Sequence, residues 1–193
     1  MRSLNLYNRI VIKIGSAVLA KPNGSVNHEI LSAISEDIAW LLKKNKEVLV
    51  VSSGAIALGR KKIQLSQKFS LAESQAMAAH GQIELMSAWK KHLNKFSIPI
   101  GQMLLTPRDT ELKVSSKNAK QTVSKLIEAG CLPIINENDS TATDEIKFGD
   151  NDLLAAKVAK LINADLLIVL STVEGLYSSE DDLKANKTSA IIK

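Results

Sequence analysis

The sequence predicts a three-layer α/β/α sandwich, an α/β fold built on a mainly parallel sheet. Short runs rich in β-branched residues alternate along the chain with longer segments of helical periodicity. Most of the short runs are apolar nearly throughout, as strands covered on both faces are. Repeated alternation of strand and helix is typical of parallel sheets with helices on both faces.

Five strands are expected, in chain order. They are RIVIKIG at 9–15, EVLVVSS at 47–53, IPIGQMLLT at 98–106, CLPIINE at 131–137 and DLLIVLST at 165–172. No internal repeat or linker interrupts this alternation, so residues 1–193 are expected to form one domain.

Helices are expected between the strands. Residues 27–44 carry an apolar stripe behind Asn27, a candidate cap. The segment 70–93 opens with Ser70 and Glu73, the residue pair of a capping box.

Two more helices complete the pattern. One ends near Ala129, where Gly130 suits the left-handed position after a helix. The last starts around Asp150, a candidate N-cap.

Composition excludes several classes of protein. Cys131 is the single cysteine, which excludes a disulfide framework and fits a reducing, cytoplasmic setting. The net charge is +5, but only 4% of residues are aromatic and the basic residues are scattered, so no nucleic-acid partner is expected. No apolar run is long enough to span a membrane. The three histidines, His28, His80 and His92, have no ligand spacing, so each is expected on a helix surface and no protein-bound metal is expected.

The ends of the strands indicate where a ligand would bind. In open α/β sheets, ligands bind beyond the carboxyl ends of the strands. Those ends read KIGSA, VVSSGA, LLTPRD, INENDS and LSTVEG. Their hydroxyls and backbone N–H groups close to helix starts suit a phosphate, although the usual phosphate-binding motifs are absent.

Lys13 is a charged residue inside an apolar strand, just before Gly15 and Ser16. An ammonium group placed there is poorly hydrated and needs an anion. It could neutralise phosphate oxygens during transfer. The alternative is a lysine on an edge strand that faces solvent.

Two further candidates have structural alternatives. Ser53 could bind a ligand or cap the helix that follows it, and Asp150 could act in a site or cap its helix. Asp139, Asn151 and Asp152 flank the same loop as Asp150, which favours a functional site at this strand end.

Five segments make the chain resemble the glutamate 5-kinases of the amino acid kinase family, from about Ile10 to Tyr177. They are VIKIGSAVL, VVSSGAIALGR, GQMLLT, PIINENDSTAT and IKFGDNDLLAA. The resemblance implies ATP-dependent phosphorylation of the side-chain carboxylate of L-glutamate, the first step of proline synthesis. It also implies Mg²⁺ carried by ATP, proline as a candidate feedback inhibitor, and a homo-oligomer.

The resemblance also implies roles for individual residues. Lys13 matches a catalytic lysine that contacts the ATP phosphates, and Asp150 matches a catalytic aspartate that orients the lysines of the site. The remaining matches are Ser53, Asp139 and Asn151 for glutamate, and Ser171 and Thr172 for the nucleotide. Asp139 is expected to pair with the α-ammonium group of the substrate, while Asn151 and Ser53 donate hydrogen bonds to other atoms of the substrate.

The sequence departs from the family pattern in its nucleotide half. Ser171-Thr172 stands where the family usually has Thr-Asp, and no Gly-rich segment with a second phosphate lysine follows before Lys193. We therefore expect an amino acid kinase domain without its C-terminal nucleotide-binding part and without the C-terminal RNA-binding-type domain of many members. Two interpretations remain open, a glutamate 5-kinase or a non-catalytic module that binds glutamate, proline or other subunits.

Overall fold

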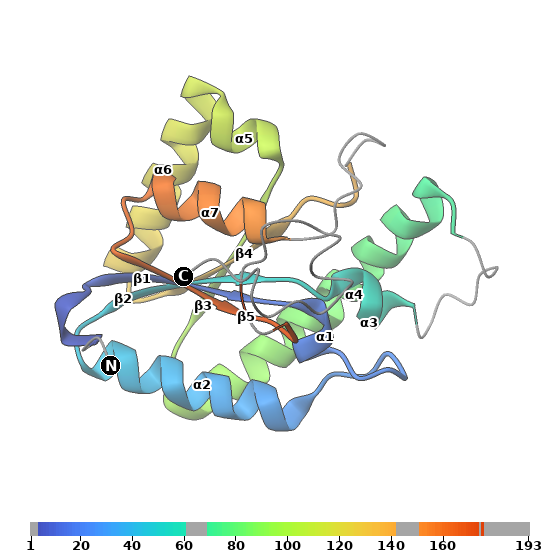
Figure 1. Cartoon of the computed structure of the whole chain (residues 1–193), viewed down its shortest axis with the longest axis horizontal. Helices are drawn as coiled ribbons and strands as arrows, with labels where there is room; N and C mark the ends of the chain where they lie inside the picture. Colours follow the sequence, from blue (N-terminus) through green and yellow to red (C-terminus); the bar gives the residue numbers. More distant parts are fainter. Residues whose placement is uncertain (1–3, 61–68, 142–150, 174, 176–193) are drawn as a thin grey trace.

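The computed structural model describes residues 4–60, 69–141, 151–173 and 175. It confirms the expected fold class, a parallel sheet flanked by helices (Figure 1). The strands are β1 (Arg9–Ile14), β2 (Glu47–Ser52), β3 (Ile100–Leu105), β4 (Leu132–Glu137) and β5 (Leu166–Leu170). Each lies within the range that the β-branched runs predicted.

The strand order is β3-β4-β2-β1-β5, and every pairing is parallel. β1 therefore lies inside the sheet, with Lys13 opposite Val51 of β2 on one side and Val169 of β5 on the other. The interpretation of Lys13 as an edge-strand lysine facing solvent is wrong.

The connecting segments form helices, whose bounds in chain order are α1 (Ser16–Leu19), α2 (His28–Lys43), α3 (Ala55–Gly59), α4 (Leu71–Leu93), α5 (Pro107–Glu111), α6 (Lys113–Glu128) and α7 (Asn151–Leu161), with short 3-10 turns at Leu4–Leu6 and Asn94–Phe96. The capping box of Ser70 and Glu73 at the start of α4 is confirmed. Gly130 has a φ of 71°, as expected after α6. Asn27 is the N-cap of α2, but its side chain makes no capping hydrogen bond.

Two hydrophobic cores lie on the two faces of the sheet. α2 and α4 cover one face, and α6 and α7 cover the other (Figure 1). Side chains alternate along a strand, so Ile10, Ile12 and Ile14 of β1 pack in the core of α2 and α4, whereas Val11 packs in that of α6 and α7. Lys13 is in phase with Val11, which directs its side chain toward the α7 face.

The expectation that every histidine lies on a helix surface is wrong for His92. His92 of α4 is 4% exposed and stacks on His28 of α2, with the ring centroids 5.3 Å apart. The Nδ1 atom of His28 lies 3.0 Å from the Nε2 atom of His92. Burial, with smaller contributions from Lys95, His28 and Lys91, lowers the pKa of His92 below its ordinary value. The packing of α2 against α4 therefore buries a residue whose spacing along the chain gave no sign of it.

Among the described residues, none of the helices has both the length and the apolar character needed to cross a lipid bilayer.

Candidate substrate-binding site

A pocket of about 220 Å³ opens at the carboxyl ends of the strands. Ser53, Asp139 and Asn151, the three residues expected to bind glutamate, all line it. They come from the end of β2, the loop after β4 and the start of α7. The other lining residues are Ser16, Gly54, Ala55, Ile56, Ala57, Arg60, Asn136 and Glu137. The volume is below the range typical of drug-sized ligands, so it suits a molecule the size of an amino acid.

Ser53 does not cap the helix that follows it. Gly54 is the N-cap of α3, with a φ of 111° and no side-chain capping bond. Glycine suits this position because other residues rarely adopt a positive φ. The backbone N–H of Ser53 donates to the carbonyl of Ile14 (3.0 Å), which ties the ends of β2 and β1 together. The capping interpretation of Ser53 is therefore wrong, and its hydroxyl remains available at the pocket.

Buried side-chain amides, hydrogen-bonded to one another, hold the elements around the pocket in place. Asn136 at the end of β4 donates from Nδ2 to Oε1 of Gln82 on α4 (2.8 Å). Asn151 donates from Nδ2 to Oδ1 of Asn136 (2.8 Å) and to the backbone carbonyl of Ser52 (3.4 Å). The indole N–H of Trp89 donates to the hydroxyl of Ser52 (3.0 Å). The end of β2, the end of β4 and the start of α7 are thus held in one arrangement by α4.

Two carboxyl groups give the pocket an acidic side. The pKa of Glu137 is raised to about 7, chiefly by burial and also by the nearby charge of Asp139, with Lys157 opposing the shift. Burial alone raises the pKa of Asp139 to about 6. Glu137 is 9% exposed, and its Oε1 atom has no hydrogen-bond partner in the described part of the chain. A cationic group bound beside both carboxyls would relieve this cost of burying them.

Lys13 lies next to the pocket but does not line it. The residue is 3% exposed, and its ammonium forms an ion pair with Asp152 at the start of α7. The ammonium lies close to Gly15, since a Cβ on that glycine would be 3.8 Å from Nζ. Asp152, two positions after Asp150, is the charged partner that the sequence left unassigned.

The residues expected to contact the nucleotide occupy the same edge. Ser171 and Thr172 are exposed and directly follow β5. The backbone N–H of Gly15 donates to the carbonyl of Leu170 (3.0 Å), which ties the end of β5 to the end of β1. Neither Ser171 nor Thr172 lines the pocket of Ser53. Asp150, the second expected catalytic residue, lies outside the described residues.

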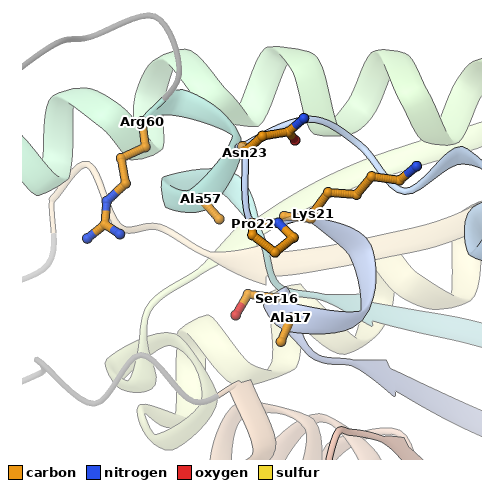
Figure 2. Close-up of a pocket in the computed structure, with 9 residues that line it drawn as sticks. Ser16, Ala17, Lys21, Pro22, Asn23, Ala57 and Arg60 are labelled. Atoms are coloured by element: carbon orange, nitrogen blue, oxygen red, sulfur yellow. The ribbon is translucent and has the colours of Figure 1, made fainter.

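A second cavity of about 510 Å³ adjoins the first and shares Ser16, Ala57 and Arg60 with it. Figure 2 shows its lining, which comes from α1, from the segment of Lys21, Pro22 and Asn23, and from α3. Among the described residues, no Asp or Glu lines this second cavity, but two basic residues, Lys21 and Arg60, line it. The first pocket therefore contains both carboxyl groups and Arg60, whereas the charged groups described for the second cavity are all basic.

Sequence reasoning missed three residues of this site, Gln82, Asn136 and Glu137. The pattern of residues along α4 could have identified Gln82. Gln82 lies seven positions before Trp89, so the two share a face of α4, and that face is apolar at Leu85. A polar residue in a buried stripe needs a hydrogen-bond partner.

A sequence model of the amino acid kinase family matches residues 8–191, and the chain belongs to that family. The parallel sheet and the site at its carboxyl edge agree with this assignment.

Within the family, the chain is similar to glutamate 5-kinases. It is 52% identical over 184 residues to a glutamate 5-kinase of Allorhizobium ampelinum, covering 95% of this chain and 47% of that protein. It is 50% identical over 188 residues to one of Rhizobium etli, covering 97% and 48%, and 50% identical over 183 residues to one of Agrobacterium fabrum, covering 94% and 47%. The chain spans about half the length of the curated relatives it matches.

Proposed function

We propose that this chain carries the amino-acid-binding site of a glutamate 5-kinase, which phosphorylates the side-chain carboxylate of L-glutamate with ATP in proline biosynthesis. One observation carries the proposal. Ser53, Asp139 and Asn151 come from three separate elements, and they line one small pocket beside a buried lysine. The names of the relatives support the same reaction.

In this proposal the pocket holds the α-amino end of glutamate. Asp139 and Glu137 supply negative charge for the α-ammonium group, since charge-assisted hydrogen bonds are the strong ones. Ser53 offers its hydroxyl to a carboxylate. Proline also carries an α-carboxylate and a protonated amine. It would therefore compete with glutamate for this part of the pocket and act as a feedback inhibitor.

The side-chain carboxylate then faces ATP. One of its oxygens attacks the γ-phosphorus, a P–O bond forms, and the bond to the bridging oxygen of ADP breaks. Lys13 lies at the edge where the phosphates would arrive and lowers the repulsion between them and the attacking carboxylate. Mg²⁺ carried by ATP would neutralise further phosphate charge. Positioning and electrostatics suffice for such a reaction, without a covalent enzyme intermediate.

Calorimetry of the purified chain with L-glutamate tests the pocket. The chain should bind L-glutamate, and Asp139→Asn should weaken binding by about 1.5–3 kcal/mol, the value of a hydrogen bond to a charged group. Asp37→Asn, the same chemical change on the exposed side of α2, should have no effect. Unchanged affinity in Asp139→Asn would remove Asp139 from the site.

The transfer step has its own readout, ADP release from Mg²⁺-ATP that depends on L-glutamate. Any such release should be lost in Asp139→Asn and retained in Asp37→Asn. Release that ignores L-glutamate would contradict the proposed acceptor.

A further inference from the structure

We propose that Gln82 of α4 is a positioning residue for this pocket. Acting through Asn136, it holds the side-chain amide of Asn151 with its carbonyl oxygen toward the ligand. Asn151 then accepts a hydrogen bond from the α-ammonium group of the substrate instead of donating one to a carboxylate. The inference rests on the proposed function, because it assigns one group of L-glutamate to one atom of the site.

The three amides form a buried chain across the molecule. Gln82, Asn136 and Asn151 are 9%, 2% and 6% exposed. They lie on α4, β4 and α7, and the two hydrogen bonds that join them are each 2.8 Å long. Gln82 itself does not line the pocket of Ser53. Its hydrogen-bonded connection to Asn151 runs through Asn136.

Two backbone groups fix the orientation of the side-chain amides of Asn136 and Asn151. The N–H of Glu137 donates to Oδ1 of Asn136 (2.9 Å), so an oxygen and not a nitrogen must occupy that position. The carbonyl of Ser52 accepts from Nδ2 of Asn151 (3.4 Å), so a nitrogen must occupy that one. Backbone groups cannot exchange donor for acceptor. A half-turn of the Asn151 amide would place its oxygen against two acceptors, the carbonyl of Ser52 and Oδ1 of Asn136.

This orientation decides whether Asn151 donates or accepts a hydrogen bond at the pocket. A side-chain amide has two N–H donors and one carbonyl acceptor. Both donors of Asn151 are directed at the protein, one at Asn136 and one at Ser52. Within the part of the chain that the structure describes, no donor pairs with its carbonyl oxygen, which leaves that oxygen for a ligand. The expectation that Asn151 donates to the substrate therefore conflicts with this geometry, whereas an accepting Asn151 acts together with the carboxyls of Asp139 and Glu137.

Gln82 helps to hold the amides of Asn136 and Asn151 in this orientation. Its Oε1 atom accepts the hydrogen bond from Asn136 Nδ2. Without that acceptor, a buried N–H group of Asn136 would lose its partner, which is costly. Gln82 thus anchors the Asn136 amide at Nδ2, while the N–H of Glu137 anchors it at Oδ1. Without Gln82 the Asn136 side chain would lose one of its two anchors, and Asn151, which donates to Asn136 Oδ1, would be held less firmly. The Nε2 atom of Gln82 has no partner in the described part of the chain, so the hydrogen bond seen for this side chain is the one that its oxygen accepts.

The test compares L-glutamate with glutarate, which has both carboxylates but no ammonium group. Calorimetry on the full 193-residue chain should show tighter binding of L-glutamate than of glutarate. Gln82→Met keeps the length of the side chain and removes the acceptor. It should weaken L-glutamate binding about 10-fold, the lower end for a hydrogen bond to a charged group, and change glutarate binding less than about twofold. Gln82→Glu keeps an acceptor oxygen and should retain the preference for L-glutamate.

The outcomes separate the alternatives. Equal weakening of both ligands in Gln82→Met would show that Gln82 only maintains the packing of the pocket, and no weakening of either would show that it has no role. Both results overturn the positioning role but leave the proposed function intact. A wild-type chain that does not bind L-glutamate overturns the proposed function and this role with it.

A second measurement applies if Gln82→Met does not fold. On the unmodified chain, the carbonyl carbon signal of the Asn151 side chain should shift in NMR spectra when L-glutamate is added, and much less with glutarate. Equal shifts with the two ligands would overturn the assignment of this oxygen to the ammonium group.

Discussion

At the scale of single residues, the pocket combines two carboxyl groups that are two positions apart in the chain. Glu137 ends β4 and Asp139 follows it, and both line the pocket. Burial raises the pKa of Glu137 to about 7 and that of Asp139 to about 6, from ordinary values of 4.5 and 3.8. Near neutral pH the pocket thus holds a proton that a bound ammonium group would displace.

We predict that L-glutamate binding strengthens as the pH rises from about 5 to 8, because the ammonium group binds the ionised carboxyls. Binding at pH 6.5 should release protons, which calorimetry detects as a dependence of the heat on the ionisation enthalpy of the buffer. Glu137→Gln should remove the part of this dependence near pH 7. A flat affinity profile without proton release would contradict the prediction.

The same shifts affect folding with a definite sign. Above the ordinary values of 4.5 and 3.8, and up to about pH 7, the folded chain binds more protons at these carboxyls than the unfolded chain does. Their contribution to the free energy of unfolding therefore falls as the pH rises through this window.

At the scale of elements, two glycines bring α3 and α4 into backbone contact. A Cβ on Gly81 of α4 would lie 1.8 Å from the carbonyl oxygen of Ala55 and 2.5 Å from the amide nitrogen of Gly59. A Cβ on Gly59 would lie 2.0 Å from the carbonyl oxygen of Met77. This close approach holds α4, which carries Gln82, against the helix that starts after Ser53.

We predict that Gly81→Ala destabilises the chain by about 3 kcal/mol, the upper end of the usual cost of overpacking, although alanine is the better helix former. Urea denaturation measures this change. L-Glutamate binding should weaken as well, because α3 and the end of β2 would shift. Ser87→Ala, at an exposed position of the same helix, is the control and should leave stability within a few tenths of a kcal/mol. Equal stability of Gly81→Ala and wild type would show that the helices can separate freely.

At the scale of the whole molecule, the site depends on the complete sheet. The pocket residues follow three different strands, and the strand order brings the ends of these strands to one edge. A ligand that joins these ends should stabilise the entire fold, since it binds only the folded chain.

We predict that L-glutamate at about 100 times its dissociation constant raises the free energy of unfolding by about 2.7 kcal/mol. For a chain of this size, that corresponds to an increase of about 5–10 °C in the unfolding midpoint. D-Glutamate at the same concentration is the control and should give a much smaller increase, because it has the same charges but the wrong handedness. An equal increase with both would indicate a general effect of the solute.

The sequence by itself determined the elements of this protein and the edge that carries its site. The β-branched runs, the capping box of Ser70 and the glycine after α6 are local signals. Each depends only on residues that are close in the sequence. Parallel strands place their carboxyl ends together. For this reason the sequence alone was enough to expect Ser53 and the loop of Asp139 and Asn151 at the same edge, and the glutamate 5-kinase resemblance grouped these three residues and supplied their expected roles.

Only the tertiary structure decided which distant groups meet. The strand order placed Lys13 inside the sheet and opposite Asp152 of α7, and the packing of α2 on α4 buried His92. The amide chain that begins at Gln82 joins residues 54 and 15 positions apart. Such contacts are invisible to local periodicity, because they depend on how whole elements pack. The orientation of the Asn151 amide is the clearest case, since backbone groups of β2 and β4, outside the helix that carries Asn151, set it.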